Sequence, residues 1–136
     1  MNPRYLLDTN ICIYLMKHHS SEVAARFEDC HTGEVVISAI TLAELEYGVI
    51  SSGENQTRNQ TALVSLLEDI AVLPFDNAAA AAYGSVRLAT RKRKHDALDK
   101  LIAALAIAQN ITLVTNNEAD FSVYPGLRIE NWVKYS

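Results

Sequence analysis

The sequence predicts an α/β domain in which helices cover both faces of a mostly parallel sheet of four to five strands. Short apolar runs alternate with helix-length segments along the whole chain. The chain has 136 residues, of which 49% are hydrophobic, which suits a single domain over residues 1–136 with a sizeable core. Charged residues make up 21%, and glycine and proline are few, so the composition excludes a disordered chain.

Short apolar runs rich in β-branched residues predict the strands. Pro74 lies near the end of one run and suits a strand end. The expected strands are, in order, residues 5–7, 35–37, 71–75, 112–115 and 127–129. Because parallel strands are joined by right-handed crossovers, all their C-terminal ends should meet at one edge of the sheet.

The segments between these strands carry apolar residues at helical spacing. Ser20 or Ser21, Asp76 or Asn77, and Asp96 are placed to cap three of the helices. The helix after Asp96 is apolar almost all round, so we expect it to be buried, with Lys100 facing solvent. The expected helices lie between residues 8 and 18 and at residues 22–29, 41–50, 55–69, 77–93 and 97–109, with a loop and short helix at 116–121.

The net charge of −4 limits how this chain could bind nucleic acid. A protein that bound RNA or DNA only by neutralising phosphates should be basic, so a metal or a local basic patch must supply positive charge. One such patch precedes the buried helix. It can be a solvated helix end favoured by the helix dipole, or it can contact RNA phosphates. Its members are Arg87, Arg91, Lys92, Arg93 and Lys94.

The two cysteines and the hydropathy profile indicate the cellular compartment that we expect for this protein. Cys12 and Cys30 form no zinc-binding pattern, and reduced thiols in a cytoplasmic protein are expected. No window approaches the ~20 apolar residues of a membrane span. Asp8 interrupts the apolar start too early for a signal peptide.

Acidic residues from distant parts of the sequence follow predicted strands or begin predicted helices. Each has a structural alternative. Asp8 can cap the first helix. Glu44 can complete a capping box with Thr41. Asp99 can interact favourably with its own helix N-terminus. The predicted topology nevertheless brings all three carboxylates to the same edge of the sheet.

Crowded carboxylates need a cation. Like charges about 4 Å apart repel by roughly 4 kcal/mol at an effective dielectric near 20. Oxygen ligands favour Mg²⁺, with Mn²⁺ as a plausible substitute. We expect Asp8 and Asp99 to bind the metal directly, Glu44 to hold a water or a second ion, and Thr9 to hydrogen-bond the cluster or a phosphate. Such a site supports phosphodiester hydrolysis.

The segment after the fourth predicted strand adds further oxygen donors at this edge. Asn116 and Asn117 form a turn that needs no function to explain it, but they can also serve as ligands. Glu118 and Asp120 follow within the same loop.

Four motifs resemble the PIN-domain ribonucleases, in particular the VapC-type toxins of bacterial toxin–antitoxin pairs. They occupy residues 6–10, 38–48, 99–104 and 113–132, so the resemblance covers nearly the whole chain. It implies a three-layer α/β/α PIN domain, a homodimer, and Mg²⁺-dependent endonuclease action on structured RNA such as tRNA. It also implies inhibition by a VapB-type antitoxin. The implied catalytic residues are Asp8, Glu44, Asp99 and Asp120, supported by Thr9, Asn10, Asn116 and Asn117.

Two positions depart from the family pattern. Asn117 stands where many members carry an acid, with Asp120 three residues on, and Leu105 stands where relatives often have histidine. These departures motivate an alternative: a catalytically impaired PIN-fold module that binds an antitoxin or RNA without cleaving it. A haloacid-dehalogenase-type phosphatase is disfavoured, because Asn10 occupies the place of that family's second acid.

Overall fold

Five short strands form the centre of the computed structural model, which describes residues 2–133. They are ordered β3-β2-β1-β4-β5, and every neighbouring pair is parallel. The predicted fold class is therefore confirmed. The strands are β1 (Tyr5–Leu7), β2 (Val35–Ser38), β3 (Ala71–Leu73), β4 (Thr112–Val114) and β5 (Ile129–Glu130).

The strand order places a topological switch point between β1 and β4. The chain builds outward from β1 through β2 to β3, then crosses back to pair β4 with the other side of β1. In open parallel sheets, ligands bind in the crevice at such a point, outside the C-terminal ends of the strands. Asp8 follows β1 and Asn117 lies in the loop after β4, and both residues reach this crevice.

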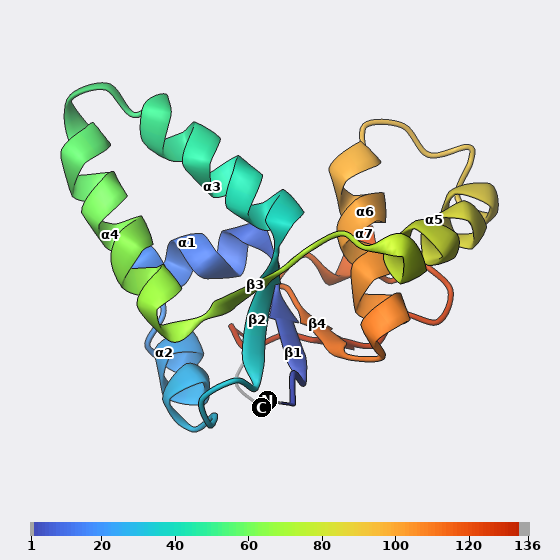
Figure 1. Cartoon of the computed structure of the whole chain (residues 1–136), viewed down its shortest axis with the longest axis horizontal. Coiled ribbons are helices and arrows are strands. Elements are labelled where there is room, and N and C mark those ends of the chain that lie inside the picture. The colour runs from blue at the N-terminus through green and yellow to red at the C-terminus, as the bar shows by residue number, and fades with distance from the viewer. Residues whose placement is uncertain (1, 134–136) are drawn as a thin grey trace.

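Helices cover both faces of the sheet (Figure 1). One group packs on one face and a second group on the other, which gives the three layers. The first group is α1 (Thr9–Lys17), α2 (Ser21–Glu28), α3 (Ala39–Ile50) and α4 (Gln56–Asp69), with a 3₁₀ turn (Gly53–Asn55) before α4. The second group is α5 (Asn77–Ala89), α6 (Ala97–Gln109) and the short α7 (Glu118–Phe121).

Successive side chains of the strands point to opposite faces of the sheet and pack into two separate hydrophobic cores. Tyr5 and Leu7 pack beneath the first helix group, whereas Leu6 packs beneath the second. Because both faces are buried, the strands read as continuous apolar runs and not as alternating ones. Leu105 is fully buried in the second core, as its apolar character predicts.

Two helix boundaries differ from prediction by two or more residues. α3 begins at Ala39 because the Ser38 hydroxyl accepts a hydrogen bond from the Thr41 N–H at 2.9 Å. Thr41 therefore lies inside the first turn, and the alternative that Thr41 and Glu44 form a capping box is excluded. α5 ends at Ala89 instead of near residue 93, and the Thr90 hydroxyl bonds back to the carbonyl oxygen of Val86 at 2.7 Å.

Strand ends shift by one or two residues from prediction. β3 stops at Leu73, before Pro74, which has no N–H to continue the ladder. The last strand is Ile129–Glu130, set by its register with Leu113 and Val114. No helix within residues 2–133 is long and apolar enough to cross a membrane.

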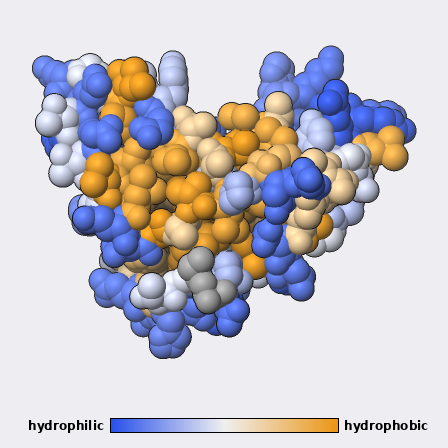
Figure 2. Space-filling view, viewed as in Figure 1, coloured by the Kyte–Doolittle hydropathy of each residue, from blue (hydrophilic) through white to orange (hydrophobic). Residues whose placement is uncertain are grey.

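Apolar side chains also reach the surface. Figure 2 shows them gathered over α4, α3 and the edge strand β3. Tyr47 and Ile50 of α3 are 73% and 69% exposed, and Val64 of α4 is 50% exposed. Large exposed apolar patches often mark interaction surfaces.

Candidate active site

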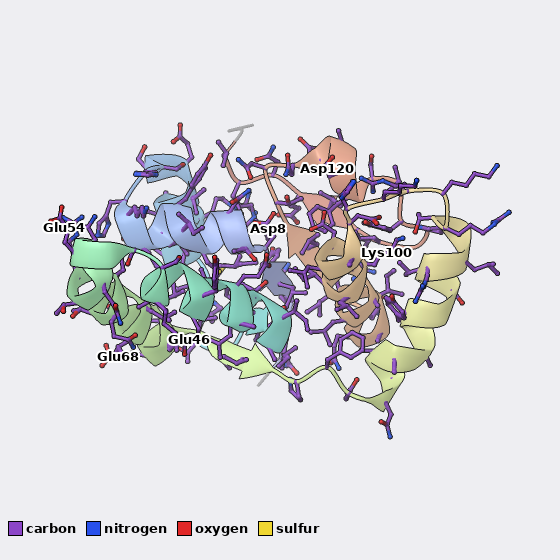
Figure 3. The ribbon with its side chains drawn as sticks, turned by 90° about the horizontal axis from the view of Figure 1, so that it is seen from above. Asp8, Glu46, Glu54, Glu68, Lys100 and Asp120 are labelled. Carbon is purple, nitrogen blue, oxygen red and sulfur yellow. The ribbon has the colours of Figure 1, made fainter. Side chains whose placement is uncertain are left out.

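A small pocket of about 140 Å³ lies at the C-terminal ends of β1 and β4. It is bounded by α1 and α3 on one side and by α6 on the other, and Figure 3 shows Asp8 at this junction. The structure thus brings together Asp8, Glu44 and Asp99, as predicted from the sequence. The lining residues are Asp8, Thr9, Asn10, Glu44, Asp99, Ile102, Asn117 and Phe121.

Asp8 is held rigidly at the end of β1. It is 5% exposed, and its Oδ1 accepts a hydrogen bond from the Ile11 N–H at 2.9 Å, which caps α1. Burial raises its pKa above the usual range, while hydrogen bonds from Thr115 and Ile11 oppose the rise. The capping alternative is therefore confirmed, and the same carboxylate still lines the pocket.

Glu44 is oriented by Thr9. The Thr9 hydroxyl donates to Glu44 Oε1 at 2.6 Å, and it lies 3.3 Å from the hydroxyl of Thr41. Thr9 was expected to hydrogen-bond the metal cluster or a phosphate, and the structure shows it bonded to Glu44, one of the pocket carboxylates. Its observed role is to connect the first turn of α1 to α3.

Asp99 lies in the first turn of α6. Burial raises its pKa to about 6, and the charge of Asp120 adds to the shift. The charges of Glu44 and Asp8 raise it further. Within residues 2–133 none of the three pocket carboxylates forms an ion pair with a basic side chain. The pocket therefore carries negative charge that nothing in the described chain neutralises.

The donor chemistry of the pocket fits a hard divalent cation. Its polar lining residues supply oxygen or amide groups, with no histidine or cysteine. As the side chains stand, no three His, Cys, Asp or Glu residues of the described chain are positioned to hold one ion. Mg²⁺ is usually bound through only one or two carboxylates and keeps several waters, so the arrangement suits it without three direct carboxylate ligands.

Of the predicted site residues in the segment after β4, only some line the pocket. Asn117 lines the pocket. Asn116 donates from Nδ2 to the Tyr14 hydroxyl at 3.0 Å, and its buried Oδ1 has no partner among the described residues. The Asp120 side chain is 51% exposed and lies 3.9 Å from Arg93 Nη2, outside the pocket lining. Asp120 therefore acts on the pocket by its charge, and its catalytic role stays a prediction.

The basic run does not form one surface. Arg93 turns inward, donating to the backbone oxygen of Asp120 at 2.7 Å and lying 3.7 Å from Asp96. An RNA contact from Arg93 is therefore disfavoured. The other members of the run are exposed, and their RNA contact stays a prediction: Arg87, Arg91, Lys92 and Lys94.

Sequence reasoning missed a group of residues around the start of α6. Lys100 was expected to face solvent, but it is only 7% exposed, and its Nζ lies 3.1 Å from Asp96 Oδ1. Asp96 precedes α6 as predicted, yet its side chain makes no capping hydrogen bond. The four-residue spacing of opposite charges could have indicated this pair. The Tyr124 partner could not be found that way, since it lies 28 residues along the chain.

Comparison with known proteins agrees with this fold. The PIN domain family model matches residues 5–127. The tRNA(fMet)-specific endonuclease VapC of Shigella flexneri is 37% identical, over 95% of this chain and 98% of that protein. Ribonuclease VapC2 of Rickettsia felis is 38% identical, over 96% and 98%.

Solved structures of similar chains share the architecture. The DNA-bound VapBC complex from Salmonella typhimurium contains a chain that superposes with a TM-score of 0.87 at 35% identity, covering 96% of this chain and 98% of that one. VapBC2 from Rickettsia felis, bound to a promoter DNA fragment, gives 0.83 at 36% identity, covering 94% and 98%. The pocket, the parallel sheet and these matches together show that this chain belongs to the PIN-domain family, among its VapC members.

Proposed function

We propose that this chain is the toxin of a toxin–antitoxin pair and a Mg²⁺-dependent endoribonuclease that hydrolyses phosphodiester bonds in structured RNA such as tRNA. The observation that carries the proposal is the pocket at the switch point, where Asp8, Glu44 and Asp99 meet without a basic partner in the described chain. The names of the VapC relatives, which include a tRNA-specific endonuclease, support the reaction and the substrate class. We place its action in the cytoplasm, where tRNA is found.

The chain's own residues would hold and orient the ion. Asp8 and Asp99 would be direct ligands, and Glu44, fixed by Thr9, would hold a coordinated water or a second ion. Mg²⁺ bound there would supply an activated water and would stabilise charge on the phosphate; Mn²⁺ could substitute. Asn117 adds an amide at the rim, and the exposed basic residues of the run before α6 would contact RNA phosphates.

An active enzyme is favoured over the impaired binding module. Leu105 is buried in the second core and does not line the pocket, so this leucine leaves the carboxylates in place. Asn117 keeps an oxygen donor at the pocket. Three carboxylates remain, and they satisfy the need for a charged metal site.

Incubation with purified total tRNA tests the proposal directly. In Mg²⁺ the protein should produce discrete tRNA fragments, which end-mapping would place at a single position. EDTA should abolish the products, and excess Mg²⁺ or Mn²⁺ should restore them, because the metal supplies the nucleophile. Equal cleavage with and without EDTA would contradict the metal-dependent mechanism.

We place the antitoxin on the first helix group. A hollow of about 310 Å³ lies between α1, α2 and α4, with mostly apolar walls. An amphipathic segment of a VapB-type antitoxin could bury its apolar side chains there. The VapBC complexes of relatives support such a partner. Its lining includes Leu15, Met16, Ala24, Phe27 and Leu66.

We also propose a homodimer that covers the exposed apolar face of α3. At micromolar concentration, size-exclusion chromatography with light scattering should show a dimer. Tyr47→Asp combined with Ile50→Asp should weaken it by at least about tenfold, because buried apolar anchors carry most interface energy. Val123→Asp, at a 43% exposed apolar residue of the loop after α7, is the control and should leave the dimer intact. A monomeric unmodified chain would contradict the proposal.

A further inference from the structure

A buried cluster of charges lies beside the pocket, at the start of α6. Asp96 is its centre: Lys100 Nζ lies 3.1 Å from one carboxylate oxygen, and the Tyr124 hydroxyl donates to the other at 2.8 Å. Arg93 Nη1 is 3.7 Å from that second oxygen. The Asp96 and Lys100 side chains are only 4% and 9% exposed. Such buried charges are stable only when paired and hydrogen-bonded.

Two residues of this cluster flank Asp99, a proposed metal ligand, in the sequence. Asp96 precedes Asp99 by three residues, and Lys100 follows it directly. The lysine ammonium is carried on a flexible four-carbon stem, which is long enough to turn toward the carboxylate of Asp99. It instead pairs with Asp96, and Figure 3 shows Lys100 on the side of α6 that faces away from Asp8.

Asp96 is also placed to cap α6 but does not do so. It is the residue before α6, where an aspartate side chain usually accepts a hydrogen bond from a backbone N–H of the first turn and stabilises the helix by ~1 kcal/mol. Its side chain makes no such bond. Both carboxylate oxygens are used by Lys100, Tyr124 and Arg93 instead.

We propose that Asp96 is a positioning residue that holds the Lys100 ammonium away from the pocket, so that Asp8, Glu44 and Asp99 stay free to bind a divalent cation. This inference rests on the metal site of the proposed function. With Asp96 neutralised, the buried ammonium needs another carboxylate, and Asp99 is its neighbour in sequence. A lysine paired with Asp99 would compete with the metal.

Mn²⁺ titration of the metal-free full chain, followed by electron paramagnetic resonance or calorimetry, tests this role without relying on activity. Asp96→Asn should weaken Mn²⁺ binding by at least about tenfold, because it leaves the Lys100 ammonium without its partner and able to compete with the cation. Asp96→Asn combined with Lys100→Met should return the affinity to within about threefold of the unmodified chain. Lys100→Met alone should also stay within about threefold, since it removes no pocket ligand.

The double variant separates positioning from support of the fold. If Asp96 only stabilised the start of α6, the double variant would bind Mn²⁺ as weakly as Asp96→Asn, because both lack the aspartate. That result, or unchanged binding by Asp96→Asn, would overturn the proposal. If the unmodified chain bound no Mn²⁺, the proposed metal site itself would fail, which is a distinguishable outcome.

Two further variants make the test robust. Glu34→Gln breaks the Arg4–Glu34 ion pair, 3.3 Å long at the opposite end of the strands, and should not change Mn²⁺ affinity. If Asp96→Asn does not fold, Tyr124→Phe removes one hydrogen bond to Asp96 and keeps every charge. It should weaken Mn²⁺ binding about tenfold, and adding Lys100→Met should return the affinity to within about threefold of the unmodified chain. Unchanged affinity, or an effect that Lys100→Met does not cancel, would overturn the proposal.

Discussion

Asp8→Asn should lower the rate of tRNA cleavage by at least about 10³-fold, which corresponds to ~4 kcal/mol of transition-state stabilisation. The substitution removes a charge from the pocket but keeps the shape of the side chain. The amide oxygen of asparagine can still accept the hydrogen bond from Ile11 that caps α1. The variant should therefore stay folded while it loses the metal. Initial cleavage rates at saturating Mg²⁺, together with thermal unfolding, measure both effects.

Glu46→Gln is the matched control for this loss. Glu46 lies on α3, two residues after Glu44, but it is exposed and does not line the pocket. Removing its charge should change the cleavage rate by less than about twofold, since exposed charges contribute little. Cleavage by Asp8→Asn at the unmodified rate would remove the pocket from the mechanism.

Asp99→Asn should stabilise the metal-free protein at pH 7 by about 2 kcal/mol. Burial and neighbouring carboxylates raise the pKa of Asp99 to about 6 from the 3.8 of a free side chain. Ionising this group at neutral pH therefore opposes folding, and the neutral amide avoids that penalty. Chemical denaturation in EDTA, compared between the variant and the unmodified chain, measures the difference.

The same shift fixes the sign of the pH dependence. Between about pH 4 and pH 6 the folded state holds the Asp99 proton while the unfolded state has lost it. The free energy of unfolding of the metal-free chain should therefore fall as pH rises through this window. Asp99→Asn should flatten that part of the profile. Bound Mg²⁺ should stabilise the unmodified chain, by ~2.7 kcal/mol at a hundred times its dissociation constant, and should not stabilise the variant.

Asp69→Asn is the corresponding control. Asp69 is exposed at the C-terminal end of α4, away from the pocket lining. Its loss should change the free energy of unfolding by less than about 0.5 kcal/mol and should leave the metal effect intact. If Asp99→Asn destabilised the metal-free chain as much as a typical core substitution, the picture of uncompensated charge would be wrong.

Much of the fold follows from local patterns. Short β-branched runs alternate with helical spacing, and this predicts parallel strands covered on both faces. Residue Asp8 at the end of the first run and residue Asp99 at the start of the buried helix could then be placed at one edge. Ser38 shows where local patterns fail to fix a helix boundary. This serine both ends a strand and caps the next helix, and the competing motif that begins at Thr41 predicted the wrong helix start.

The sequence alone determined the parallel α/β architecture and the gathering of Asp8, Glu44 and Asp99 at the C-terminal strand ends, because periodicity and chain direction are local properties. Only the tertiary structure decided how the neighbouring charges are used. It buried Lys100 against Asp96, turned Arg93 inward and set Thr9 against Glu44. These contacts depend on which long side chain reaches which carboxylate once distant segments pack, and on the burial that makes each pairing necessary.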